Sequence, residues 1–134
     1  MQAAWLHHAR LVYLANPDNP GGHCLTHAEI AGLIDHLPPT CHLLLDEAYH
    51  EFRPDPGESL PLSGVVRLRT FSKAHGLAGL RIGYAIAAPE LLEVMYKVRI
   101  HYAVSSMALT AASVVLTHED EVRQHVQALS LIHI

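Results

Sequence analysis

Four short apolar runs, each followed by polar or turn-forming residues, constrain the fold of this chain most strongly. They are Leu11–Ala15, Cys41–Leu45, Val65–Phe71 and Ile82–Ala88. Apolar runs that are separated by a helix or a long connection are typical of strands in a mostly parallel sheet with helices on both faces. The sequence therefore predicts an α/β fold with three layers, α/β/α.

Helical signals lie between and after these runs. Thr26 and Glu29 have the spacing of a capping box, and apolar residues recur at helical spacing up to Pro38, which predicts a helix over 26–36. The segments 89–98 and 105–116 are also predicted to be helices, and the second, rich in Ala and Met, is expected to be buried. Residues 53–64 contain three prolines and two glycines and are expected to form a surface loop.

Length and charge exclude several classes of function. The chain has 134 residues, of which 50% are apolar, enough for about one domain with a sizeable core. The formal net charge of −4 leaves no basic field for nucleic acid or an anionic membrane. No apolar stretch approaches the roughly 20 residues that span a bilayer, and the N-terminus lacks the pattern of a signal peptide. We expect a cytoplasmic protein with no nucleic-acid or membrane partner.

Polar residues follow three of the apolar runs directly. The first run is followed by the loop 16–22, which has the sequence NPDNPGG. The second is followed by Asp46-Glu-Ala-Tyr49 and the third by Ser72-Lys73. In sheets of this class the ligand lies beyond the carboxyl ends of the strands. The sequence therefore predicts that these three segments meet on one rim.

Asp46 follows three consecutive leucines and is expected at the end of a buried strand. A bare carboxylate there would cost several kcal/mol, which indicates a cationic partner. Capping of the following turn is an equally good interpretation of Asp46 on its own. Tyr49 could present its hydroxyl at the same rim, although a tyrosine after a strand is more often simply packed.

Lys73 and Arg81 stand eight residues apart behind the third run, with Thr70 and Ser72 just before the lysine. Arg81 offers a planar fork for phosphate, and the two hydroxyls can donate hydrogen bonds to the same anion. Taken alone, such a segment is more often ordinary surface. A lysine close to an anion-binding arginine and opposite a buried aspartate is also what a Schiff-base site requires.

Taken in order, these motifs resemble those of the fold-type I pyridoxal-phosphate aminotransferases. The matching segments are the loop 16–22, Asp46–Tyr49, Thr70–Lys73 and Gly79–Tyr84. Within that family they are most similar to the histidinol-phosphate aminotransferase branch, over residues 9–126. Each motif alone is weak, but four in the right order and spacing make coincidence improbable.

The resemblance implies pyridoxal 5'-phosphate as cofactor and assigns roles to seven residues. Lys73 would carry the cofactor as a Schiff base and move the proton at the substrate, and Asp46 would pair with the pyridine nitrogen. Tyr49 and Asn19 would hydrogen-bond the phenolic oxygen, and Asn19-Pro20 would be a cis peptide. The phosphate would be held by Arg81, Thr70 and Ser72.

The same resemblance implies a reaction and an assembly. The implied enzyme moves an amino group from an amino acid or amino-alcohol phosphate, with histidinol phosphate favoured, to a 2-oxo acid such as 2-oxoglutarate. It acts as a homodimer. A decarboxylase of the threonine-phosphate type and a non-enzymatic effector sensor are the alternatives. Residues 1–134 would be part of the large domain, without the N-terminal segment and the C-terminal small domain, and both ends of the chain look cut. The chain alone is therefore expected to be inactive.

Departures from the family pattern limit the substrate assignment. Gly21 replaces a usual Thr in the first loop. In the segment 97–105, which resembles a part of the family that lies near the substrate, His101 replaces a proline and Ala103 an asparagine. His23 and His27 have a spacing seen in metal sites, but no second cluster of ligands accompanies them, so no metal site is expected.

Overall fold

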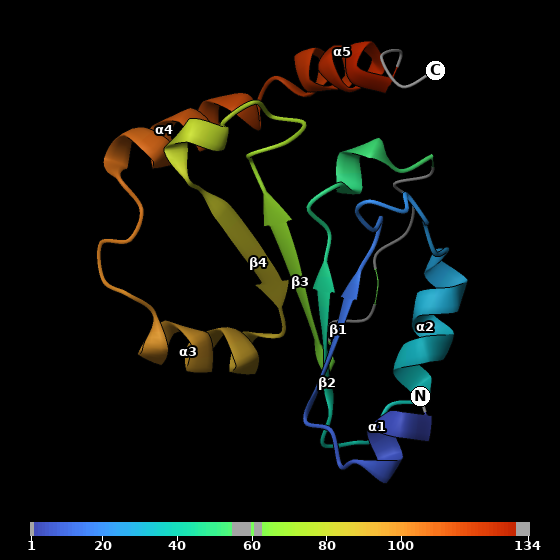
Figure 1. Ribbon diagram of the computed structural model, residues 1–134. Coiled ribbons are helices and arrows are strands. Elements are labelled where there is room, and N and C mark those ends of the chain that lie inside the picture. Colours follow the sequence, from blue (N-terminus) through green and yellow to red (C-terminus); the bar gives the residue numbers. More distant parts are fainter. Residues whose placement is uncertain (1, 55–59, 61–62, 131–134) are drawn as a thin grey trace.

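A computed structural model describes residues 2–54, 60 and 63–130 of the chain (Figure 1). Its centre is a four-stranded sheet in the order β1-β2-β3-β4. The strands are β1 (Leu11–Ala15), β2 (His42–Asp46), β3 (Val65–Thr70) and β4 (Gly83–Ala87). The first three are parallel and β4 is antiparallel to β3, so the sheet is mixed. The predicted α/β class and mostly parallel sheet are confirmed.

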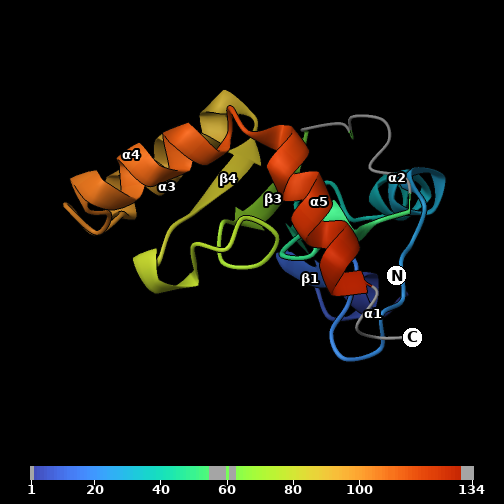
Figure 2. The same ribbon diagram turned by 90° about the horizontal axis from the view of Figure 1, so that it is seen from above.

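Five α-helices and two short 3-10 helices surround the sheet in the described part of the chain. The α-helices are α1 (Gln2–Leu6), α2 (His27–Asp35), α3 (Pro89–Val98), α4 (Ser106–Val115) and α5 (Glu119–Ser130). The 3-10 helices are η1 (His50–Phe52) and η2 (Ala78–Leu80). Figures 1 and 2 show α2 on one side of the sheet and α3 and α4 on the other side, beside β4. Among the described helices, none is both long enough and apolar enough to cross a membrane.

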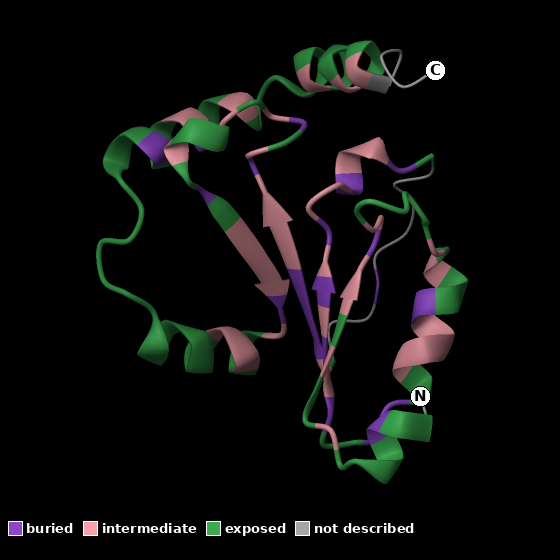
Figure 3. Ribbon diagram, viewed as in Figure 1, coloured by how far each residue is buried: buried purple, intermediate pink, exposed green. Residues whose placement is uncertain are grey.

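Helix α2 covers one face of the sheet and forms the main core with it. Its start is set by the predicted capping box, in which Thr26 and Glu29 each bond to the backbone of the other. Ile30 from this helix and Leu43 and Leu45 from β2 are fully buried. Figure 3 shows buried positions, in purple, in both elements. Alternate residues of a strand point to opposite faces, so Leu44 and Asp46 lie on the face away from α2.

A smaller core joins α4 to the end of β3. Ala108 and Ala112 of α4 pack there with Phe71 and Ile82. The rest of α4 is largely exposed, and 70% of the surface of Met107 is open to solvent. The expectation that this helix is buried was therefore wrong. Small side chains are enough for the narrow contact that α4 makes, and its apolar outer face has no cover within the described residues.

Several element boundaries were predicted well, and others were missed. β1 and α3 have the predicted bounds, and the other predicted elements differ by a residue or two. The helices α1 and α5 were not predicted. The expected surface loop 53–64 lies partly outside the described residues.

Gly83 sets how closely β4 approaches β3. Gly83 pairs with Thr70 in the antiparallel register, and a Cβ atom at this position would lie 2.7 Å from the backbone carbonyl oxygen of Arg69. Backbone cannot move aside as the end of a flexible side chain can. Only glycine therefore fits at the start of β4 without separating the two strands.

We predict that Gly83→Ala lowers the free energy of unfolding by about 1–3 kcal/mol, because overpacking of this size costs that much. The matched control is Gly79→Ala in η2, where no atom lies within 4 Å of the added Cβ. Chemical denaturation of the full chain measures both. Equal stability of the two variants would contradict the close approach of β3 and β4.

Candidate functional site

A cleft of about 330 Å³ lies at the carboxyl ends of β2 and β3. Five of the seven residues singled out from the sequence line it: Asp46, Thr70, Ser72, Lys73 and Arg81. Ala48, Leu68 and Arg69 complete the wall. The remaining two, Tyr49 and Asn19, are joined to each other and to Lys73 by the contacts described below. The sheet thus brings all seven residues to one rim, because β1, β2 and β3 run in the same direction.

The carboxylate of Asp46 is held at both oxygens. Its Oδ1 accepts a hydrogen bond from the backbone N–H of Ala48 at 3.0 Å, and its Oδ2 accepts one from the Tyr13 hydroxyl at 2.7 Å. Asp46 therefore does cap the following turn. Among the described residues no cation forms an ion pair with it, so the expected cationic partner is not supplied by this part of the chain.

Lys73, Tyr49 and Asn19 form a second group at the rim. The Nζ of Lys73 lies 5.3 Å from the centre of the Tyr49 ring, a cation–π distance. The Asn19 side-chain amide donates a hydrogen bond to the Tyr49 hydroxyl oxygen at 2.8 Å. Because that oxygen accepts from Asn19, the hydroxyl proton of Tyr49 stays available for an anionic partner. Asn19-Pro20 is cis, as the resemblance predicted, and Asn16-Pro17 is cis as well.

Thr70, Ser72 and Arg81 supply hydrogen-bond donors to the same cleft. The backbone N–H of Ser72 donates to the Thr70 hydroxyl oxygen at 3.1 Å, which fixes the turn after β3. Arg81 is exposed and left-handed, with φ of 51°, a conformation that is rare for residues other than glycine. One of its Nη atoms donates to the Ala78 carbonyl at 2.9 Å. Backbone strain of this kind often marks a functional site.

A buried ionic cluster lies under the rim, on the face of the sheet opposite to Asp46. Glu47 is 1% exposed and accepts two hydrogen bonds from Arg67 and one from Arg69, all at 3.0 Å. Burial alone would raise the pKa of Glu47, but the hydrogen bonds from the two arginines outweigh burial and hold its pKa below the ordinary value. This carboxylate thus ties the end of β2 to β3.

His50 completes this cluster without carrying charge. Its Nδ1 lies 3.9 Å from a carboxylate oxygen of Glu47. Burial, followed by the nearby charge of Arg69, lowers the pKa of His50 to about 4. The imidazole is therefore neutral near pH 7, and the charge of Glu47 is balanced by the arginines.

Asn16 anchors the loop that carries Asn19. Its side chain is fully buried and exchanges two hydrogen bonds with the backbone of Leu25, at 2.7 and 3.1 Å. Its backbone N–H donates to the carbonyl of Asp46 at 2.8 Å. The loop is therefore fixed at both ends.

His75 and the segment 97–105 do not line the cleft. His75 packs its ring against Phe71, with 5.0 Å between the ring centres. The segment 97–105 runs from the end of α3 to the start of α4 at the outer edge (Figure 1). Tyr102 in this segment is fully exposed. Within the residues that the structure describes, no three histidine, cysteine or acidic side chains are grouped closely enough to hold a metal ion.

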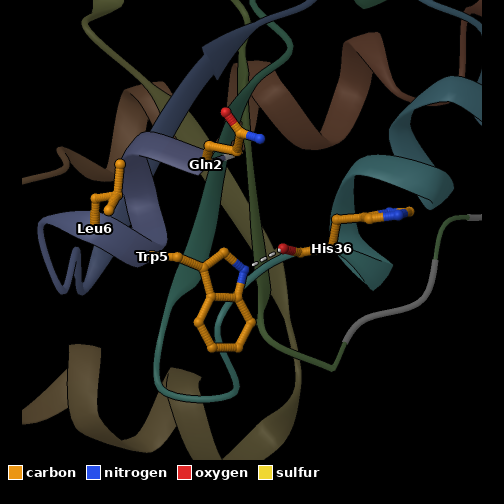
Figure 4. Close-up of a pocket in the computed structure, with 4 residues that line it drawn as sticks. All are labelled: Gln2, Trp5, Leu6 and His36. Carbon is orange, nitrogen blue, oxygen red and sulfur yellow. Dashed lines mark hydrogen bonds between the residues drawn. The ribbon is translucent and has the colours of Figure 1, made fainter.

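A second hollow lies at the opposite end of the sheet. It measures about 600 Å³ and is lined by Gln2, Trp5, Leu6 and His36 (Figure 4). The Trp5 indole N–H donates to the His36 carbonyl across it at 3.0 Å. Its lining is apolar and holds no charged pair, so it offers binding area but none of the groups that reactions at an amine or phosphate need.

Three residues near the cleft were missed in the sequence: Tyr13, Glu47 and Arg69. The signal that could have found them is strand alternation. Tyr13 lies two residues before Ala15, which pairs with Asp46, so the side chains of Tyr13 and Asp46 lie on the same face of the sheet. Arg67 and Arg69 are separated by one residue in an otherwise apolar strand, which predicts a shared buried partner beside them.

The charges of the cleft suit a phosphorylated pyridine aldehyde. Lys73 offers a primary amine, Arg81 with two hydroxyls offers donors for a phosphate, and Asp46 offers a carboxylate for a protonated ring nitrogen. Among the described residues, neither Lys73 nor Arg81 is paired with an acidic side chain, so both cations remain available to an anionic ligand. The residues present therefore fit such a group.

Comparison with known proteins gives concordant matches. The family model described as aminotransferase class I and II matches residues 3–133. The aromatic amino acid aminotransferase of Rhodococcus erythropolis is 42% identical over 125 residues, which are 90% of this chain and 35% of that protein. Histidinol-phosphate aminotransferase 1 of Mannheimia succiniciproducens is 43% identical over 121 residues, covering 86% of this chain and 33% of that protein.

A solved structure agrees with these relatives. The histidinol-phosphate aminotransferase from Sinorhizobium meliloti, in complex with pyridoxal-5'-phosphate, superposes with a TM-score of 0.87 at 38% identity. The match covers 94% of this chain and 36% of that one. The chain thus spans about a third of the length of the relatives it matches.

We predict that Glu47→Gln lowers the free energy of unfolding by about 3–5 kcal/mol, because it leaves the buried Arg67 and the half-buried Arg69 without their counter-charge. Glu93→Gln on the exposed side of α3 is the control and should change the same quantity by less than about 0.5 kcal/mol. Denaturant titration of the full chain compares them. If both substitutions had the same small effect, the Glu47 cluster would not hold the strands together.

Proposed function

The chain belongs to the family of class I and II aminotransferases, and from this premise we propose that it forms the cofactor-binding part of a pyridoxal-phosphate-dependent aminotransferase. The observation that carries the proposal is the position of Asp46, Lys73 and Arg81 around one cleft. Because the chain spans about a third of its relatives' length, the activity, substrates and partners of the whole protein are proposals too. Residues 1–134 are then part of its large domain.

Lys73 is the residue that would carry the cofactor. When bound, pyridoxal phosphate supplies an aldehyde that condenses with amines and a pyridine ring that accepts electrons from a substrate carbon. Lys73 is exposed and unpaired among the described residues, so its amine can reach an aldehyde. Its Nζ would be the group that takes the proton from the substrate's Cα and delivers it to the C4′ carbon of the cofactor.

Asp46 would keep the pyridine nitrogen protonated. Its carboxylate is fixed by Ala48 and Tyr13, and each of its oxygens has a further lone pair with which to accept from a ring N–H. Tyr49, whose hydroxyl oxygen already accepts from Asn19, would donate its proton to the phenolic oxygen of the cofactor. The two residues would thus contact two different polar groups of the same ring.

The phosphate of the cofactor would be held by Arg81, Thr70 and Ser72. All three line the cleft, and the turn after β3 places the two hydroxyls beside the arginine. A guanidinium with hydroxyl donors is a strong combination for a phosphate, because charge-assisted hydrogen bonds are about twice as strong as neutral ones. These three residues would hold the cofactor by its phosphate, and Lys73 would remain free to move the substrate's proton.

Histidinol phosphate is the proposed amino donor, and a 2-oxo acid such as 2-oxoglutarate is the proposed acceptor. The support for this choice is the similarity to histidinol-phosphate aminotransferases, including the one with a TM-score of 0.87. Aromatic amino acids are the second candidate, favoured by the relative from Rhodococcus erythropolis at 42% identity. Both donors are primary amines that carry an aromatic ring.

We propose that the whole protein is a homodimer and that it is located in the cytoplasm. The apolar side chains of Val98, Ile100, Tyr102 and Met107 are each at least 70% exposed around α3 and α4. Apolar surface gathered in this way marks an interaction face in many proteins. A second subunit that covers this face would remove it from water.

We predict that pyridoxal phosphate, added to the full chain and reduced with borohydride, modifies Lys73. The unpaired amine in the cleft is the reason, and peptide mapping by mass spectrometry is the measurement. Lys97 on α3 is the chain's other lysine and serves as an internal control. Label on Lys97 alone, or on neither lysine, would overturn the proposed cofactor site.

The whole protein, of which residues 1–134 are proposed to be one part, tests the reaction once it is loaded with the cofactor. Histidinol phosphate should convert the bound cofactor to its pyridoxamine form faster than phenylalanine does, as followed by absorbance. Faster conversion by phenylalanine would move the assignment to aromatic amino acids. Release of CO2 from threonine phosphate would favour a decarboxylase, and cofactor binding without any turnover would favour an effector sensor.

A further inference from the structure

Tyr13 is an exposed tyrosine whose hydroxyl reaches the candidate site. It lies in the middle of β1, and 59% of its surface is open to solvent. Because Ala15 pairs with Asp46 in the parallel register, Tyr13 and Asp46 stand on the same face of neighbouring strands. The 2.7 Å hydrogen bond from its hydroxyl to Oδ2 of Asp46 crosses between the two strands.

This hydrogen bond completes the support of the Asp46 carboxylate. The backbone N–H of Ala48 holds Oδ1 at 3.0 Å and the Tyr13 hydroxyl holds Oδ2. With one donor on each oxygen, the carboxylate cannot rotate about its Cβ–Cγ bond without losing a contact. Removing Tyr13 would leave the group tethered at Oδ1 alone.

We propose that Tyr13 is a positioning residue, which orients the Asp46 carboxylate for pairing with the ring nitrogen of pyridoxal phosphate. The inference rests on the proposed function, since it concerns the carboxylate that would meet that nitrogen. Tyr13 acts through Asp46 and does not itself handle the reacting atoms.

The chemistry of the pair agrees with this role. A carboxylate oxygen has two lone pairs, so Oδ2 can accept from Tyr13 and from a ring N–H together. The hydrogen bond to Asp46 raises the pKa of Tyr13, and burial and the negative charge of Asp46 raise it further. The hydroxyl therefore keeps its proton, and so remains a donor, throughout the neutral and mildly alkaline range.

Tyr13→Phe tests the inference, because it removes the hydroxyl and keeps the ring. We expect the dissociation constant for pyridoxal phosphate in the full chain, measured by absorbance titration, to rise about tenfold, as for loss of a hydrogen bond to a charged group. Tyr96→Phe on α3 is the matched control: Tyr96 is 62% exposed and lies outside the cleft. It should leave the dissociation constant unchanged.

A cofactor analogue separates positioning from a merely structural role. In 1-deaza-pyridoxal phosphate a carbon replaces the ring nitrogen, so Asp46 has no ring N–H to meet. Tyr13→Phe should then change the dissociation constant by less than about twofold, as it should for pyridoxal phosphate in the Asp46→Asn background. A loss as large with the analogue as with the natural cofactor would overturn the inference, as would no loss with either.

These outcomes are distinct from failure of the proposed function. If wild-type protein forms the Lys73 adduct and Tyr13→Phe binds the cofactor as tightly as wild type, this inference alone fails. If wild type forms no adduct, the proposed function fails and the inference fails with it. A cofactor-free readout is the ultraviolet titration of the tyrosines: Asp46→Asn should lower the pKa of Tyr13, and an unchanged pKa would contradict the contact.

Discussion

The buried carboxylate of Glu47 is the interaction on which the cleft depends. It joins the end of β2 to Arg67 and Arg69 of β3 through three hydrogen bonds of 3.0 Å. A buried carboxylate without these cations would cost several kcal/mol, so the two strand ends have to stay together. Asp46 directly precedes Glu47, and the turn to Lys73 directly follows β3. The cluster therefore sets the distance between the two sides of the cleft.

Because side chains alternate between the two faces of a strand, the adjacent acids Asp46 and Glu47 have different roles. Consecutive side chains of β2 point to opposite faces, so Glu47 enters the ionic cluster while Asp46 faces the cleft. The buried acid is neutralised by arginines of the same chain. The acid at the rim meets only neutral donors, Ala48 and Tyr13, among the described residues. Its charge is therefore left for a cation from outside the described residues, which suits a protonated pyridine.

Strand ends were easier to predict from the sequence than contacts across them. The apolar runs located β1 to β4, and the turn-forming residues after them located the loop of Asn19 and the segment of Lys73. Hydrogen bonds between strands, such as that from Tyr13 to Asp46, depend on register, which apolar runs alone leave open. The exposure of α4 could not be predicted either, because an Ala-rich apolar helix has the same pattern whether a neighbour covers it or not.

The central claim is that Asp46 serves as the counter-ion of a cofactor ring held in this cleft. The most direct measurement is ¹⁵N NMR of the full chain loaded with pyridoxal phosphate that is labelled at its ring nitrogen. The account predicts the chemical shift of a protonated nitrogen at neutral pH in the wild type, and that of an unprotonated nitrogen in Asp46→Asn. The same shift in both proteins would contradict it.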